Sequence, residues 1–283
     1  MRWQMGRRST NVEDRRGSRI PLLAGGGIGG LVLLIVALIF GVDPRALMQS
    51  APENQASPQQ TSTESRPADP MADFVSVVLA DTEDTWSQIF SDQLGRTYDP
   101  PKLVLFSGAT RSACGLAESA TGPFYCPSDQ AVYIDLEFYR ELKDRFGAPG
   151  DFAQAYVIAH EVGHHVQSLL GRAQDVHQAE ARSNQREANA LSVRLELQAD
   201  CYAGVWGHSA SERNVLEQGD LEEALNAASA IGDDRLERGT GREVTPDSFT
   251  HGSSTQRTFW FRRGFETGDI GQCETFEAAS LGD

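Results

Sequence analysis

The pattern of apolar and polar positions predicts a mostly helical chain. Apolar residues recur near the helical period in four long segments and two shorter ones. We therefore expect helices over 74–89, 138–146, 151–170, 184–206, 220–232 and 255–265. The helix over 151–170 has Asp151 and Gln154 in a capping-box arrangement at its start and Gly171 at its end, which are typical helix boundaries.

Two short runs have a different pattern, which predicts strands. Residues 102–106 and 131–136 are rich in β-branched and aromatic side chains. A free edge of such a strand can pair with an extended peptide. The polar segments 173–183 and 233–245 are expected to be loops, the first of them over a cleft. The overall pattern indicates an α+β domain, mostly helical, with a small edge sheet.

An uncharged apolar segment precedes this domain. Residues 21–42 carry no charged side chain until Asp43, and as a helix they would span roughly 33 Å, enough to cross a bilayer. We expect an uncleaved transmembrane helix, because the apolar run is longer than that of a signal peptide and no clear cleavage site follows. Gly25, Gly29, Gly26 and Gly30 form pairs that favour a homo-oligomer of membrane helices, or simply a glycine-rich helix end.

Charge is distributed unevenly along the chain. Residues 1–20 hold six arginines against two acidic residues, whereas the whole chain has a net charge of −15. The basic start predicts a cytoplasmic N-terminus and a periplasmic or extracellular domain. The acidic body argues against a nucleic-acid partner. Residues 43–70 are rich in Pro, Ser, Gln and Thr and predict a disordered linker, so the folded domain is expected over 71–283.

The cysteines are consistent with export. Cys114, Cys126, Cys201 and Cys273 allow three disulfide pairings. We favour Cys114–Cys126 with Cys201–Cys273. Zinc binding by these cysteines is the alternative, but the chain has no C-x-x-C pair.

The central chemical motif lies in the segment 151–170. It reads His160-Glu161-Val162-Gly163-His164, and on a helix its two imidazoles leave the same face one turn apart. Two such imidazoles can hold Zn²⁺, and Glu161 can act as general base toward the attacking water. The alternative is a helix with surface histidines, but the chain holds only six histidines. The spacing therefore predicts a zinc site.

Catalytic zinc needs a third protein ligand. Glu196 and Asp200 lie four residues apart on the next long predicted helix, so both carboxylates share one helix face. Without the histidine motif, this would be read as an acidic, solvated face. Together with that motif, it predicts Glu196 as a metal ligand and Asp200 as the residue that orients a ligating imidazole.

These motifs resemble those of the gluzincin metallopeptidases, and more closely a bacterial family of putative neutral zinc metallopeptidases. The resemblance covers nearly the whole chain apart from the linker and residues 173–190, and is carried by segments 11–17, 106–115, 122–126, 159–167, 195–204 and 250–254. It implies a zincin-like domain with His160, His164 and Glu196 as zinc ligands and Glu161 as catalytic base. Asp200 would bond the first imidazole.

The other histidines carry weaker signals. Gluzincin sites often use a His, Tyr or Arg to stabilise the oxyanion, and the resemblance allows this role for His251, in the segment 250–254. A loop-capping histidine is the equally simple alternative. His165, His177 and His208 are expected to be structural or exposed.

The sequence thus predicts a membrane-anchored zinc metallopeptidase that acts on a protein or peptide. One alternative is an envelope binding protein in which zinc only stabilises the fold. Another is a zinc amidase acting on a different amide, such as that of peptidoglycan.

Overall fold

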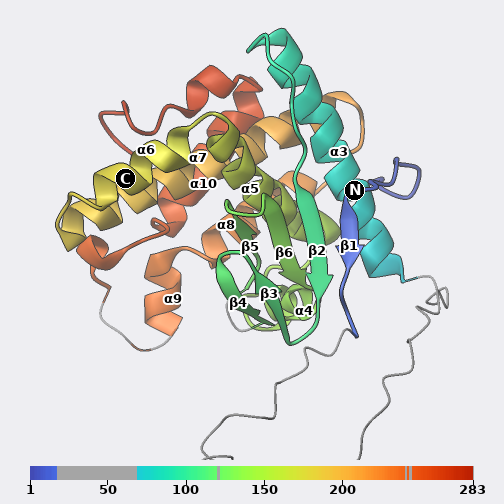
Figure 1. The fold of residues 1–283 in the computed structure, drawn as a ribbon, viewed down its shortest axis with the longest axis horizontal. Helices are drawn as coiled ribbons and strands as arrows, with labels where there is room; N and C mark the ends of the chain where they lie inside the picture. Colours follow the sequence, from blue (N-terminus) through green and yellow to red (C-terminus); the bar gives the residue numbers. More distant parts are fainter. Residues whose placement is uncertain (18–68, 120–121, 240, 242–243, 283) are drawn as a thin grey trace, which may run out of the picture. The chain divides into compact units, whose positions relative to one another are not determined.

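Helices form most of the fold, and a small sheet packs against them (Figure 1). The computed structural model describes residues 1–17, 69–119, 122–239, 241 and 244–282. Its α-helices are α3 (Pro70–Asp92), α4 (Glu137–Asp144), α5 (Asp151–Leu169), α6 (Arg172–Glu180), α7 (Gln185–Glu212), α8 (Asp220–Ala230), α9 (Asp233–Gly239) and α10 (Ser254–Thr267). The six helices predicted from periodicity are all present.

The main sheet has the strand order β1-β2-β6-β5. Its strands are β1 (Val12–Asp14), β2 (Lys102–Phe106), β6 (Ala131–Asp135) and β5 (Phe124–Cys126). β1, β2 and β6 are parallel, and β5 is antiparallel to β6. A separate hairpin joins β3 (Ala109–Ser112) to β4 (Gly115–Glu118). The fold class is therefore α+β as predicted, but the predicted strand over 131–136 lies inside the sheet, whose edge strands among the described residues are β1 and β5.

Residues 1–17 belong to the same compact unit as residues 69–283. β1 pairs with β2, and the guanidinium of Arg7 lies 2.8 Å from a carboxylate oxygen of Glu83 on α3. Glu83 also accepts hydrogen bonds from Ser9 and Asn11. The prediction of a folded domain that begins at residue 71 therefore needs correction, because carboxylates of α3 neutralise arginines that the composition assigned to a cytoplasmic segment.

The predicted membrane helix (21–42), its glycine pairs and nearly all of the predicted linker lie outside the described residues. Among the residues that are described, no helix has the length and hydropathy needed to cross a membrane. Because residues 1–17 pair with the domain, both must lie on the same side of any membrane. The predicted topology, with residues 1–20 in the cytoplasm and the domain outside, is incompatible with this pairing.

α5 is the central helix, with 14 of its 19 residues buried. Its start differs from the prediction. Gly150 is the N-cap and no side chain of the predicted capping box caps the helix. Instead, the Phe152 amide donates to Glu223 of α8 over 3.1 Å, and Asp151 lies 2.7 Å from the Met1 nitrogen. Tertiary contacts thus replace the local cap.

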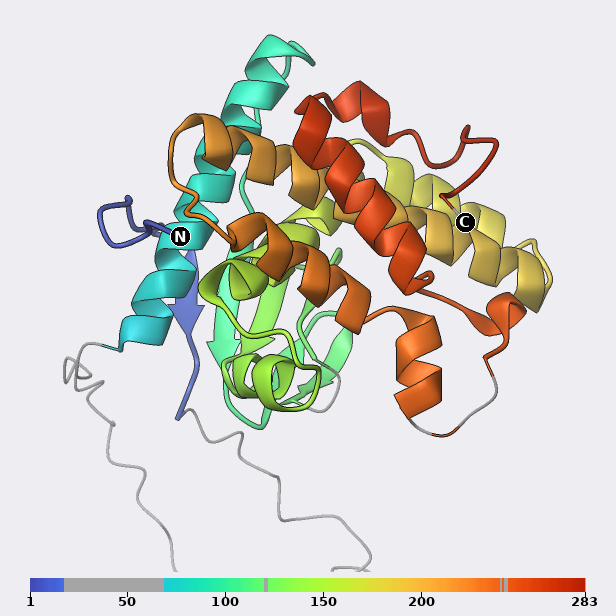
Figure 2. The same ribbon diagram turned by 180° about the vertical axis from the view of Figure 1, so that it is seen from behind.

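Glycines allow the helices around α5 to pack closely. A Cβ on Gly163 would lie 3.0 Å from the carbonyl oxygen of Ala199 on α7, and one on Gly264 of α10 would overlap the carbonyl of Cys201. Figure 2 shows α8 and α10 side by side on the face opposite that of Figure 1. These close contacts bring α5, α7 and α10 together at one site.

Both segments predicted to be loops contain helices. α6 occupies most of 173–183 and buries only Ala173 and Val176, and α9 buries none of its residues. Such sparse burial leaves little apolar periodicity to detect.

Both favoured disulfides are present. Cys114 pairs with Cys126, and Cys201 pairs with Cys273, with Cα atoms 5.8 and 5.6 Å apart. Disulfides persist in oxidising compartments, so they indicate an extracytoplasmic domain.

Candidate metal centre

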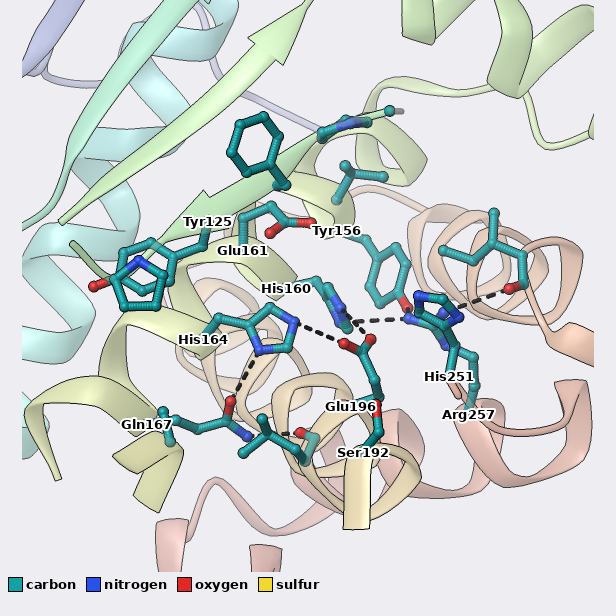
Figure 3. A pocket seen from close by; sticks show the side chains of 18 of the residues that line it. Tyr125, Tyr156, His160, Glu161, His164, Gln167, Ser192, Glu196, His251 and Arg257 are labelled. Carbon is teal, nitrogen blue, oxygen red and sulfur yellow. Dashed lines mark hydrogen bonds and ion pairs between the residues drawn. The ribbon is translucent and has the colours of Figure 1, made fainter. Parts of the chain in front are cut away.

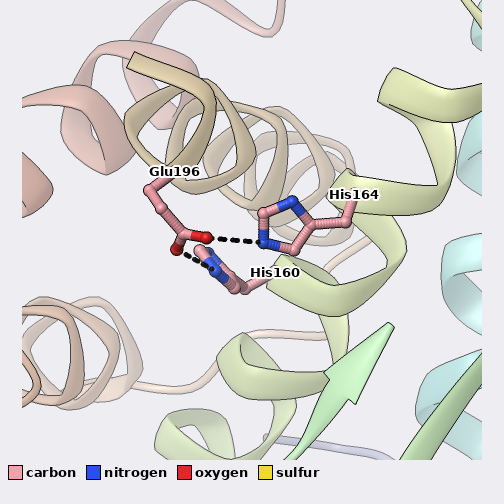
Figure 4. A group of neighbouring side chains, drawn as sticks. All are labelled: His160, His164 and Glu196. Carbon is pink, nitrogen blue, oxygen red and sulfur yellow. Dashed lines mark hydrogen bonds and ion pairs between the residues drawn. The ribbon is translucent and has the colours of Figure 1, made fainter. Parts of the chain in front are cut away.

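His160, His164 and Glu196 converge on one point between α5 and α7 (Figure 4). Nε2 of His160 lies 3.2 Å from one carboxylate oxygen of Glu196, and Nε2 of His164 lies 3.3 Å from the other. α5 supplies both histidines one turn apart, and the close approach at Gly163 brings Glu196 to them. The structure therefore brings together the three ligands expected from the sequence.

This arrangement fits a tetrahedral zinc ion. Zinc holds histidine nitrogens and carboxylate oxygens at about 2.0–2.2 Å, so donors of a tetrahedral site are roughly 3.3 Å apart. The two nitrogen–oxygen distances agree with this spacing. Two imidazoles and one carboxylate are also the donor set of catalytic zinc sites that keep a fourth position open.

Asp200 contacts the imidazole of His160 on the side that faces away from Glu196. Its Oδ1 lies 2.9 Å from Nδ1 of His160, which leaves Nε2 of that ring directed at Glu196. Arg257 of α10 donates to both carboxylate oxygens of Asp200, over 2.9 and 3.0 Å, and the hydroxyl of Tyr156 donates to Oδ1 as well. Asp200 therefore contacts the ring nitrogen of His160 that faces away from Glu196, and its orienting role stays a prediction.

The charges at this site favour a cation. Burial lowers the pKa of His160, but the charge of Asp200 and hydrogen bonds to Asp200 and Glu196 raise it to about 10. Burial raises the pKa of Glu196, but His164 and His160 outweigh it and hold the pKa well below its usual value. Carboxylates that remain ionised beside two imidazoles stabilise positive charge between them.

Gln167 holds the second imidazole. Its Oε1 lies 2.9 Å from Nδ1 of His164 (Figure 3). Its amide nitrogen donates to the backbone carbonyl of Leu195 over 2.6 Å. Both ligating imidazoles are therefore fixed through Nδ1 and direct Nε2 at the proposed metal position, as outer hydrogen bonds do in zinc sites.

A cavity of about 680 Å³ opens beside the three ligands. Glu161 lines it, next to His160 and His164. Burial raises the pKa of the Glu161 carboxyl, with the neighbouring histidines acting in the opposite direction. A carboxylate with a raised pKa accepts a proton more readily, which is what the predicted role of Glu161 as general base requires.

His251 also lines the cavity. Its Nδ1 lies 3.2 Å from Oδ1 of Asp233, whose other oxygen accepts the backbone N–H groups of Thr250, His251 and Gly252. The hydrogen bond to Asp233 raises the pKa of His251, although burial lowers it. The structure thus places His251 at the site but leaves its role a prediction.

The remaining histidines lie away from the ligand set. His165 is fully buried, with Nε2 2.7 Å from the carbonyl oxygen of Asp99 and Nδ1 3.0 Å from the hydroxyl of Tyr125 on β5. His208 lies 2.8 Å from the carbonyl of Phe265. His177 is exposed, as expected, but it also lines the cavity.

Arg257, Tyr156 and Gln167 were not predicted from the sequence. Tyr156 and Gln167 lie on the motif helix, at positions four residues before His160 and three after His164. This helical spacing was an available signal. Arg257 lies 57 residues beyond Asp200, and no local spacing connects the two.

Known proteins are similar to this chain over most of its length. The profile described as "Putative neutral zinc metallopeptidase" matches residues 1–276. The chain belongs to this family. It is 57% identical to "Uncharacterized protein YpfJ" of Escherichia coli K12 over 98% of this chain and 99% of that protein. It is 40% identical to "Uncharacterized protein Rv2575" of Mycobacterium tuberculosis H37Rv over 87% of each chain. No solved structure matches it.

Proposed function

We propose that this protein is a zinc-dependent metalloendopeptidase. The observation that carries the proposal is the spacing of the two imidazoles and Glu196, which suits a tetrahedral zinc, beside a cavity that Glu161 also lines. The family name implies the same metal. A site that only stabilised the fold would need neither an open cavity nor a carboxylate beside the ligands.

The residues divide the chemistry among them. His160, His164 and Glu196 would hold the zinc, which supplies Lewis-acid activation of water and of the scissile carbonyl. Glu161 takes the proton of the attacking water and passes it to the departing amine. His251, held by Asp233, donates a hydrogen bond to the developing oxyanion.

The unpaired edge of β5 is evidence in favour of a peptide substrate. β5 pairs only with β6 in the described sheet, and residues 122–125 line the cavity. An extended peptide can add to such an edge through main-chain hydrogen bonds. The Cys114–Cys126 disulfide and the contact between Tyr125 and His165 hold β5 in place.

The cavity wall favours an apolar side chain in the substrate. Phe138, Phe146 and Val157 line it, and Ile231 and Leu236 line it as well. Val157 lies on α5 one turn before Glu161, so these side chains adjoin the proposed reaction centre. Burying apolar side chains against one another is favourable, so cleavage is expected next to apolar residues.

The test uses the purified full chain, loaded with zinc, and a denatured protein mixture as substrate. Mass spectrometry of new peptide termini should show cleavage that is concentrated at apolar residues. Glu161→Gln should retain zinc and lower the rate by about 10²-fold or more. Glu180→Gln is the matched control, because Glu180 also lines the cavity but contacts none of the three ligands in the described structure.

Two results would contradict the proposal. If the wild type binds zinc but produces no new termini, the site is not that of a peptidase. If Glu161→Gln and Glu180→Gln cleave equally fast, Glu161 is not the base.

We infer that the described domain works outside the cytoplasm, which its two disulfides support. Membrane attachment through residues 21–42 remains part of the proposal. The fold adds one requirement, that residues 1–17 reach the same side as the domain.

A further inference from the structure

A chain of buried hydrogen bonds leads from His164 to a disulfide. Nδ1 of His164 contacts Gln167, and the amide nitrogen of Gln167 lies 3.2 Å from Oε1 of Gln198 on α7. The amide nitrogen of Gln198 donates to the carbonyl oxygen of Cys273 over 3.0 Å. Cys273 is bonded to Cys201, which lies three residues beyond Gln198 on α7. Gln167, Gln198 and both cysteines are fully buried.

Backbone carbonyls fix the direction of every bond in this chain. A carbonyl can only accept, so the Cys273 carbonyl requires the NH₂ group of Gln198 and turns Oε1 toward Gln167. The Leu195 carbonyl likewise requires the NH₂ group of Gln167. Oε1 of Gln167 must then face His164, so Nδ1 of that ring carries the proton and Nε2 keeps its lone pair for a metal.

A shift of the Cys273 carbonyl would therefore change how Gln198 and Gln167 hold the ring of His164. Cys273 ends the short 3-10 helix η3 (Ile270–Cys273), outside the helices that carry the ligands. Thr275 and Arg194 of α7 exchange hydrogen bonds next to it, and Glu274 lies 3.0 Å from Arg172. Arg172, Glu274 and Arg194 are partly exposed and Thr275 is buried. The disulfide differs from these contacts because it attaches Cys273 to α7 covalently, inside the core.

We propose that the Cys201–Cys273 disulfide is a support of the zinc site, which acts on His164 through Gln198 and Gln167. Gln167 and Gln198 are positioning residues in this scheme. The proposal rests on the metal site assigned above, but it does not depend on the reaction that the site carries out. It also predicts that loss of this disulfide lowers zinc affinity in the folded protein.

The test measures the zinc dissociation constant of the full chain by competition with a chromophoric chelator. Gln167→Met should weaken zinc binding by roughly 10- to 100-fold, as loss of a direct partner of a ligating histidine does. Gln198→Met acts one bond further away and should weaken it several-fold. The double variant Cys201→Ala/Cys273→Ala should have an effect of the same size as Gln198→Met.

The other disulfide provides the matched control. Cys114→Ala/Cys126→Ala removes a bridge between β5 and the turn that joins β3 to β4, away from this chain of bonds. Zinc affinity should not change in this variant. Circular dichroism identifies which variants are folded. If the cysteine variants do not fold, unchanged zinc affinity in Gln198→Met still overturns the proposal, because the disulfide acts on His164 through Gln198.

A combined variant distinguishes an effect that passes through Gln198 from a general destabilisation of the fold. If the disulfide acts through Gln198, adding Gln198→Met to Cys201→Ala/Cys273→Ala should weaken zinc binding little further. Fully additive losses, or unchanged affinity in Gln198→Met, would overturn the proposal. A wild-type chain that binds no zinc would instead disprove the metal site, and zinc binding without peptide cleavage would disprove only the peptidase function.

Discussion

The buried pair of Arg257 and Asp200 offers a direct test of how the site is held. Replacing Arg257 by Met keeps most of the apolar stem and removes the charge. Asp200 is fully buried, so its carboxylate would then lack its only charge-neutralising arginine within the described structure. Asp200 would still accept hydrogen bonds from Tyr156 and His160.

The magnitude follows from this geometry. Removing one partner of a buried ion pair typically destabilises a protein by about 3–5 kcal/mol. Asp200 keeps two hydrogen-bond donors in Arg257→Met. We therefore expect this variant to lose about 3 kcal/mol of stability, near the lower end of that range. With a urea m-value of about 3 kcal/mol per molar, the unfolding midpoint should fall by about 1 M.

The assay is urea unfolding of the zinc-free protein, followed by circular dichroism, so that metal binding does not contribute to stability. Arg262→Met is the control, because Arg262 lies on the same helix and is exposed. An exposed substitution of this kind should change stability by no more than about 0.5 kcal/mol. The double variant Asp200→Asn/Arg257→Met should recover part of the loss, since it removes the unpaired charge. Equal midpoints for Arg257→Met and Arg262→Met would refute the reasoning.

Three further results are expected. Gly163→Ala should lower the free energy of unfolding by about 1–3 kcal/mol and weaken zinc binding, because its Cβ would press against Ala199. Gly239 has open space around it, so Gly239→Ala should change neither the urea midpoint nor the zinc affinity. His251→Ala should lower kcat by roughly 10²-fold with zinc affinity unchanged in chelator competition, and an intact kcat would exclude the oxyanion role. Glu83→Ala should cost about 2–4 kcal/mol in urea unfolding, because Glu83 accepts three hydrogen bonds from the N-terminal segment; a change below about 0.5 kcal/mol would mean that this segment does not stabilise the domain.

Local sequence patterns predicted the long helices and the ligand set. The five residues from His160 to His164 lie on one helix, so their spacing alone places both imidazoles on the same face. Glu196 and Asp200 share a face for the same reason. Each of these inferences needs only the geometry of a single helix.

The short elements were less predictable. β1 and β5 have three residues each, too few for an alternating pattern to stand out, and α9 buries no residue. The predicted capping box of α5 was wrong. Asp151 and Gln154 suit such a cap, but the Phe152 amide donates to Glu223 of α8 instead.

The sequence by itself determined that His160 and His164 share one helix face, as do Glu196 and Asp200, since helical periodicity is a local property that spacing reveals. Only the tertiary structure decided what holds those residues in place. Arg257 reaches Asp200 across 57 residues, and Cys273 reaches Gln198 across 75. β1 joins a strand about ninety residues away. Such contacts depend on how whole helices and strands pack, and no spacing along the chain specifies that packing.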